Sequence, residues 1–324
     1  MSNSLRTQAL AEGALLAALT AILGLAGIYL PFIRLFTDML WTIPIVVVTV
    51  RHGLKTGAVS LGVAGILILV LAHPLSAFFL LLQFGGLALF YGVAFKKGYK
   101  PASALLAGTG VAVLSLFLVV ILMINLFGLD VVNIAKQMET SIEPTLELYN
   151  KLGFFKHSTQ TGITEEVVRQ MLEAFTQTFV LLIPALFVLW ALATAFLNYV
   201  LAQMVLTRLK IRIVVLPPFR EWQLPWWVVW GFIIGFATYL VGDYFRLEKF
   251  LHIGMNIMLI YAPILFILGL AVAVFYIGKY IKSTASRLFV ILIALLFFRF
   301  IFLALMVVGL LDLLLNYRHL PIKK

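Results

Sequence analysis

Residues 8–30 read QALAEGALLAALTAILGLAGIYL, the first of four apolar stretches that follow one another between Gln8 and Phe95. A helix needs about 20 apolar residues to cross the hydrocarbon core of a bilayer. Three of the four stretches (8–30, 55–72 and 75–95) approach or exceed that length, whereas 38–50 is too short to cross alone. We expect helical residues from 33–37, or a tilt, to complete the second span.

The composition of the whole chain agrees with this beginning. Of the 324 residues, 63% are hydrophobic and only 11% are charged, and the mean hydropathy is +1.11. Soluble domains carry roughly 25% charged residues. The sequence therefore predicts an all-α integral membrane protein, a polytopic bundle of eight or nine transmembrane helices. The expected spans are 8–30, 38–50, 55–72, 75–95, 102–127, 167–207, 225–244, 253–279 and 287–314.

The basic residues predict the orientation. The net charge is +11, and thirteen Lys and Arg lie on the face shared with the N-terminus, whereas the opposite short turns hold only Arg34, Arg246 and Lys249. The positive-inside rule places the N-terminus in the cytoplasm. Nine spans would put the basic tail outside, so one late segment is expected to be re-entrant or incomplete. Because the cations form short clusters between apolar runs, we expect them to meet the lipid bilayer and not nucleic acid.

One long hydrophilic segment, 128–166, falls on the external side. Glu139, Glu143 and Glu147 recur every four residues on one helical face, with apolar residues on another, and Pro144 should kink this helix. An amphipathic helix on the membrane surface or over the bundle is favoured; the alternative is a lid that gates a cavity. Thr164 followed by Glu165 and Glu166 predicts a second helix start.

No pattern in the sequence indicates catalysis. The chain has no cysteine, no Gly-x4-Gly-Lys-Ser/Thr loop for ATP and no Gly-x-Ser-x-Gly elbow, and its five histidines lack ligand spacing. We expect no enzyme activity, no cofactor and no metal.

Small residues form two rows along the first helix. Ala17 and Ala21 continue a row from Ala9 and Gly13, and Ala14 and Ala18 form a second. Such rows let another helix approach closely in lipid. They predict either packing within this protein or a docking face for a separate subunit.

Arg299 is the intramembrane residue whose position needs the most explanation. It lies among Phe297, Phe298, Phe300 and Phe302 in the middle of the last expected span. A charge there is costly, so we expect Arg299 to be buried and either to pair with a carboxylate, with Asp243 and Asp312 as the candidates, or to line a polar cavity.

The segment 14–71 resembles the substrate-binding (S) components of energy-coupling factor transporters. An Ala-rich first helix, an external loop with Leu30-Pro-Phe32, a short helix around Ile43-Pro44 and the turn Gly53-Leu-Lys-Thr-Gly57 carry the resemblance. It implies a six-helix core over 1–208. The external segment 128–166 within this core and the membrane extension of about three helices over 209–324 are not features of S components. The resemblance also implies that the alanine rows dock a coupling subunit, which works with ATPases.

Over its whole length the chain resembles the YybS-type family of predicted bacterial membrane proteins, a domain of unknown function. The residues that carry this resemblance are PFREWQLP at 218–225 and GLLDLLLNYR at 309–318. This resemblance implies that the membrane is the cytoplasmic membrane of a bacterial cell.

Together these features predict a substrate-binding or uptake component for a small, vitamin-like molecule, with no ATPase of its own. The side chains expected to contact the molecule are Arg34, Asp38, Trp41, Gln83 and Asn125. The alternative is a membrane scaffold or regulatory partner of envelope proteins that transports nothing. A secondary transporter is disfavoured, because we find no internal repeat.

Overall fold

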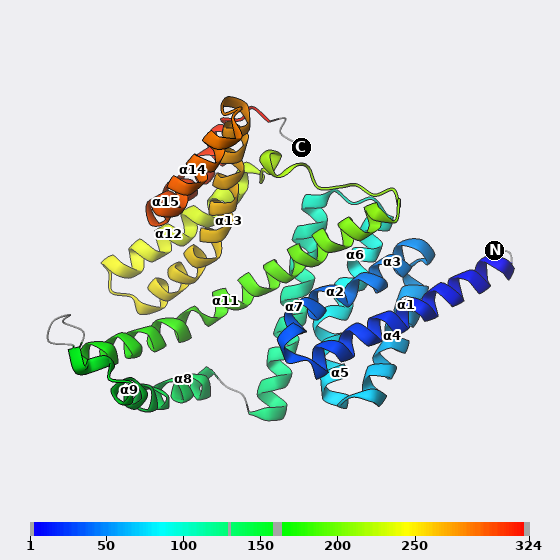
Figure 1. Cartoon of the computed structure of the whole chain (residues 1–324), viewed down its shortest axis with the longest axis horizontal. Helices are drawn as coiled ribbons and strands as arrows, with labels where there is room; N and C mark the ends of the chain where they lie inside the picture. The colour runs from blue at the N-terminus through cyan, green and yellow to red at the C-terminus, as the bar shows by residue number, and fades with distance from the viewer. Residues whose placement is uncertain (1–2, 129–130, 158–163, 321–324) are drawn as a thin grey trace. The chain divides into compact units, whose positions relative to one another are not determined.

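The computed structural model describes residues 3–128, 131–157 and 164–320, and every element in these ranges is a helix (Figure 1). Eight of the described helices are long and apolar enough to cross a membrane, which confirms the all-α polytopic class. The helices are α1 (Asn3–Tyr29), α2 (Arg34–Leu40), α3 (Thr42–His52), α4 (Leu54–Leu71), α5 (Pro74–Leu80), α6 (Gly86–Lys96), α7 (Pro101–Phe127), α8 (Val131–Thr140), α9 (Ile142–Lys151), α11 (Glu165–Arg208), α12 (Val229–Tyr244), α13 (Glu248–Tyr280), α14 (Thr284–Leu296) and α15 (Phe298–Leu315).

The chain forms two compact units. Unit 1 contains Met1–Gly128 and Phe187–Leu216, and unit 2 contains Leu129–Leu186 and Pro217–Lys324. The division falls inside α11, shortly after Pro184. The boundaries of these units differ from the expected domain boundary at residue 208. The division into a core and an extension stays a prediction.

Unit 1 is built around the short helix α3. All its residues from Thr42 to Val50 are buried, and it packs against α1, α4 and α6. The expected span 38–50 is in fact two helices. Pro44 lacks an amide hydrogen, and its ring crowds the carbonyl of Leu40, where α2 ends. At about 1.5 Å per residue, α3 covers roughly half of a bilayer, so it is enclosed by the other helices of unit 1.

Polar groups in the core of unit 1 are paired with one another. The hydroxyl of Thr42 donates to the side-chain oxygen of Asn198, and the Asn198 amide donates to the Thr194 carbonyl. Tyr91 donates to the Ala195 carbonyl at 2.8 Å, and its ring lies 5.4 Å from that of Tyr199. These contacts fasten the C-terminal half of α11 to α3 and α6, because an unpaired polar group is costly in an apolar interior.

In unit 2, Asn256 of α13 forms hydrogen bonds to the backbone of α11 beside Pro184. Pro184 removes one backbone hydrogen bond of α11. The Asn256 side chain accepts from the Ala185 amide at 2.9 Å and donates to the Leu181 carbonyl at 3.0 Å. An intramembrane amide therefore supplies hydrogen bonds to the backbone beside the proline.

The last expected span, 287–314, is broken at Phe297 into α14 and α15. α15 crosses α13 at two glycines: a Cβ on Gly269 would lie 1.8 Å from the Leu305 carbonyl oxygen, so only glycine allows this approach. Tyr276, near the end of α13, donates to the Tyr317 carbonyl at 3.0 Å. Tyr317 and Lys279 therefore lie at the same end of unit 2, and the membrane side of this end stays a prediction.

A buried ion pair fastens this end of unit 2. Arg318 binds the Asp312 carboxylate through Nε at 3.1 Å and Nη2 at 2.7 Å, and it donates to the carbonyls of Arg220 and Trp222, each at 2.7 Å. The exposed fractions of the two side chains are 0% and 2%. The stretches 218–225 and 309–318 thus meet through one guanidinium.

We predict that Arg318→Met destabilises the protein by about 3–5 kcal/mol, because it leaves the Asp312 carboxylate buried and unpaired. The melting temperature in detergent measures the loss. Arg318→Met with Asp312→Leu should recover part of it, and the exposed Lys282→Met is the control. A melting temperature for Arg318→Met equal to that of the wild type would contradict the prediction.

Candidate functional site

The side chains predicted to bind a substrate all lie in unit 1. Arg34 and Asp38 form an ion pair of 3.6 Å along α2. Trp41 is completely buried, its indole N–H has no acceptor within the described residues, and its ring meets that of Phe84 edge-on at 6.1 Å. Gln83 is half-buried in the π-helical segment Leu81–Gly85, which joins α5 to α6. π-Helical segments often occur at functional sites.

Asn125 does not share this environment. Its side chain is exposed near the end of α7, and it donates to the Ile121 carbonyl of its own helix at 2.7 Å. The structure thus joins Arg34 to Asp38 and places Gln83 next to the ring partner of Trp41, while the Asn125 amide is occupied within α7. Ligand contact by these five residues stays a prediction.

The two alanine rows of α1 have different environments. Ala17 and Ala21 are buried in a cluster with Ala64 and Ile68 of α4. The expectation that they dock a separate subunit is therefore wrong, because they already pack inside unit 1. Ala14 and Ala18 are exposed, so docking through this row stays a prediction.

The expectation of a buried Arg299 is also wrong. Its side chain is exposed, because the break at Phe297 places Arg299 in the first turn of α15 and not inside a continuous span. The carboxylate of Asp312, one of its expected partners, is held by Arg318 instead. Arg318 is the buried cation of this region.

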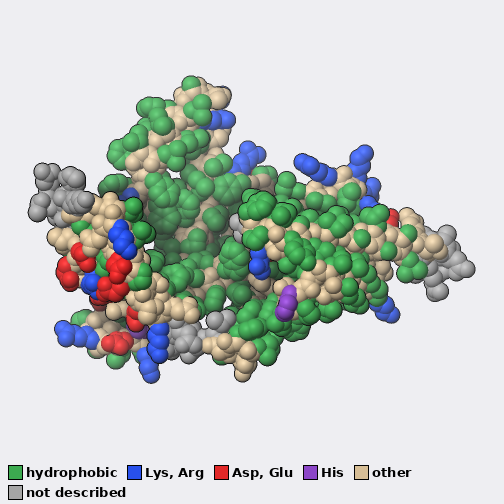
Figure 2. Space-filling model, turned by 60° about the horizontal axis from the view of Figure 1, so that its bottom comes forward, with side chains coloured by type: hydrophobic (Ala, Val, Ile, Leu, Met, Phe, Trp, Pro, Cys, Tyr) green, Lys and Arg blue, Asp and Glu red, His purple; other side chains and the backbone are tan. Residues whose placement is uncertain are grey.

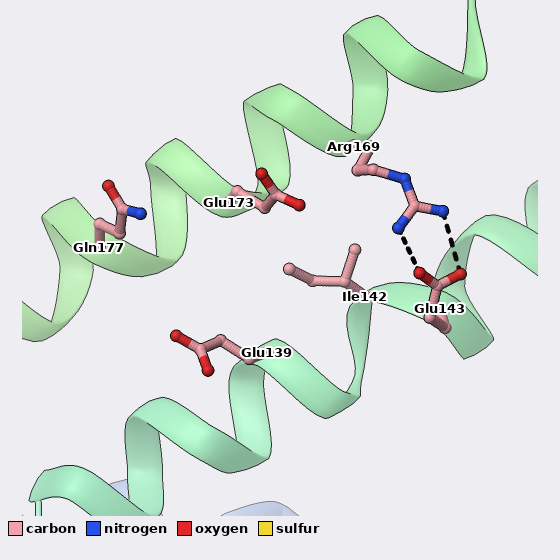
Figure 3. Close-up of a pocket in the computed structure, with 6 residues that line it drawn as sticks. All are labelled: Glu139, Ile142, Glu143, Arg169, Glu173 and Gln177. Carbon is pink, nitrogen blue, oxygen red and sulfur yellow. Dashed lines mark hydrogen bonds and ion pairs between the residues drawn. The ribbon is translucent and has the colours of Figure 1, made fainter.

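An open cleft lies in unit 2 between the helix pair α8–α9 and the N-terminal part of α11. The predicted external helix breaks at Ser141, shortly before Pro144, and this break brings Ile142 and Glu143 toward α11. The cleft has a volume of about 340 Å³, and its lining residues are Glu139, Ile142, Glu143, Arg169, Glu173 and Gln177. Ile142 is buried and separates the two acidic groups of the lower wall (Figure 3).

One end of the cleft is closed by an ion pair. Both terminal nitrogens of Arg169 donate to the Glu143 carboxylate, one of them at 3.1 Å. Such a two-point contact fixes geometry as well as charge. The hydrogen bond from Arg169, helped by its positive charge, lowers the pKa of Glu143 from the ordinary value of 4.5.

The remaining carboxylates are available to a ligand. Glu139 and Glu173 face the space between the helices from opposite walls, with the Gln177 amide beside them (Figure 3). Within the described residues, neither carboxylate has an ion pair. Since Arg169 neutralises Glu143, the cleft keeps two unbalanced negative charges. Figure 2 shows the Asp and Glu side chains gathered over this segment, whereas hydrophobic side chains cover most of the other surface in view.

This arrangement suits an organic cation better than a metal ion. No three His, Cys, Asp or Glu side chains in the described ranges are close enough to hold a metal. Two separated carboxylates and one amide can instead accept hydrogen bonds from ammonium groups some distance apart. The sequence showed the acidic face at Glu139 and Glu143, but it could not show that Glu173 and Gln177 lie across from it.

Comparison with known proteins identifies the family but assigns no activity. The model of a family described as "Predicted membrane protein (DUF2232)" matches residues 18–313. The "Uncharacterized protein YybS" of Bacillus subtilis (strain 168) is 29% identical over 293 residues, which cover 86% of this chain and 88% of that protein. No solved structure matches the chain, so the likeness of the first six spans to the S-component fold stays a prediction. The chain is a multi-pass membrane protein that belongs to the DUF2232 family.

Proposed function

We propose that the protein binds a small, positively charged molecule in the cleft between α8–α9 and α11 and serves its uptake. The observation that carries this proposal is a cavity of about 340 Å³ whose two walls each hold a carboxylate, Glu139 and Glu173, without an ion pair within the described residues. This volume is at the lower end of the range for small-molecule sites, roughly 300–1,000 Å³. The ligand class is therefore a metabolite of vitamin size or smaller with one or two ammonium groups.

The predicted orientation supports a role in uptake. With the N-terminus in the cytoplasm, the segment 128–166 lies outside the cell. A ligand that arrives from outside would therefore reach the cleft before it reaches the membrane. In a later step of uptake, the molecule would be bound by polar side chains of unit 1, for which we propose Arg34, Asp38, Trp41 and Gln83. Transport would draw its energy from a coupling subunit and ATPases, as the S-component resemblance implies.

A scaffold function is the second candidate, and one observation favours it. Ala14 and Ala18 are exposed on α1, where a helix of another protein could pack closely. A scaffold needs no ligand, so a binding measurement separates the two functions.

We predict that 1,4-diaminobutane binds the purified protein and that Glu139→Gln with Glu173→Gln weakens binding by up to about 25-fold. Exposed ion pairs contribute up to about 1 kcal/mol each, roughly a fivefold change in affinity per carboxylate. Equilibrium dialysis with the labelled diamine measures the affinity. Glu147→Gln, which removes an exposed carboxylate outside the cleft, is the matched control, and 1,4-butanediol is the neutral ligand control. Equal affinities for the wild type and the double variant would reject the cleft as the site.

We also predict that the Glu143–Arg169 pair holds α9 against α11 at mildly acidic pH. Because the pKa of Glu143 is lowered, the pair stabilises this arrangement above the ordinary pKa and is lost only as the pH falls through the lowered value. The chain has no cysteine, so spin labels can be placed uniquely at Leu148→Cys and Met171→Cys, two exposed positions.

The expected distance distribution between these labels is unchanged from about pH 7 to pH 5 and broadens as the pH falls through the lowered pKa of Glu143. With Glu143→Gln it should be broad at every pH. A distribution that stays narrow in Glu143→Gln would show that the ion pair does not position α9.

A further inference from the structure

Unit 1 carries a strong excess of positive charge. Its sequence ranges contain ten Lys and Arg but only two acidic residues, Glu12 and Asp38, a net charge of +8. Asp38 pairs with Arg34, and Glu12 contacts Arg51 at 3.1 Å and His52 at 2.8 Å. Both acids therefore contact cations of unit 1, and the excess of positive charge in this unit is not balanced by its own acidic residues.

Three turns bring several cations to one end of unit 1. A Cβ on Gly53 would lie 3.3 Å from the Lys96 ammonium nitrogen, so the α3–α4 turn meets the end of α6. A Cβ on Gly98 would lie 3.9 Å from a methyl carbon of Val214, so the α6–α7 turn meets the segment after α11. Six of the exposed cations on these turns form what we name the basic rim: Lys55, Lys96, Lys97, Arg208, Lys210 and Arg212.

Exposed apolar side chains alternate with the cations of the basic rim. Leu54, Leu209 and Val214 are 52%, 43% and 44% exposed. Ile211, Ile213 and Leu216 on the same segment pack against the core of unit 1, which holds the intervening side chains outward. Cations next to exposed apolar groups suit the boundary between hydrocarbon and headgroups, where the apolar groups enter the membrane and the cations meet phosphates.

The position of the basic rim along the helices agrees with that boundary. Four of the candidate membrane spans begin or end there, at Leu54, Lys96, Pro101 and Arg208. The rim is therefore located where apolar helices leave the bilayer.

We propose that the basic rim binds the headgroups of anionic phospholipids in the surrounding leaflet. The six cations face one end of unit 1, have no ion pairs within the described residues, and flank apolar groups that insert beside the lipid chains. A soluble polyanion such as nucleic acid would match the charge but not the exposed leucine and valine side chains between the cations. Binding holds this end of unit 1 at the membrane surface, independently of any ligand in the acidic cleft.

The test uses the full-length protein in nanodiscs with equal amounts of phosphatidylglycerol and phosphatidylcholine. After brief extraction in a neutral detergent, mass spectrometry counts the lipids retained by the protein. We expect phosphatidylglycerol to be enriched, and Lys210→Gln with Arg212→Gln to lower the enrichment by about fivefold per charge removed. The charge-preserving pair Lys210→Arg with Arg212→Lys should keep it.

The matched control is Arg246→Gln with Lys249→Gln, in the turn between α12 and α13. That turn also holds Asp243 and Glu248, so its charges balance, and its neutralisation should leave the enrichment unchanged. Equal melting temperatures in neutral detergent establish that each variant is folded. No enrichment in the wild type, an equal loss in both Gln variants, loss in the charge-preserving pair, or displacement of the lipid by a short single-stranded DNA would each overturn the proposal.

Discussion

The burial of α3 is the constraint on which the arrangement of unit 1 depends. This helix is apolar on every side and too short to cross a bilayer, and every residue from Thr42 to Val50 is buried. In lipid, backbone groups at the ends of so short a helix need partners or an enclosing protein surface. The helices α1, α4 and α6 provide that surface, and the hydrogen bond from Thr42 to Asn198 fastens α11 beside it.

Polar groups inside the two units serve mainly to fix helices. Asn198 and Asn256 each bond to the backbone of α11, one in unit 1 and one in unit 2 beside Pro184. Arg318 joins the end of α15 to the connection before α12. The Glu139 and Glu173 carboxylates, in contrast, have no ion pair within the described residues. The proposed function therefore rests on the cleft that they line.

The sequence predicted most helices, because apolar length alone identifies a membrane span. It failed where a local residue interrupts a helix, as Pro44 does before α3, and where a break has no proline to announce it, as at Phe297. The exposed Arg299 and the buried Arg318 show a second limit. Burial depends on which helices pack together, and the residues flanking Arg299 could not show that Arg318 reaches Asp312. The sequence did not predict the cleft for the same reason, since its two walls come from segments that are separate in the sequence.

The dependence of diamine binding on ionic strength tests the central claim most directly. Charges in an open cleft are screened by salt, because the Debye length falls from about 30 Å at 0.01 M to about 3 Å at 1 M. If 1,4-diaminobutane is held by Glu139 and Glu173, its affinity should fall several-fold as sodium chloride rises through this range. An affinity that does not change with salt would contradict the account, because it would place the ligand in a buried site such as that around Trp41 and Gln83.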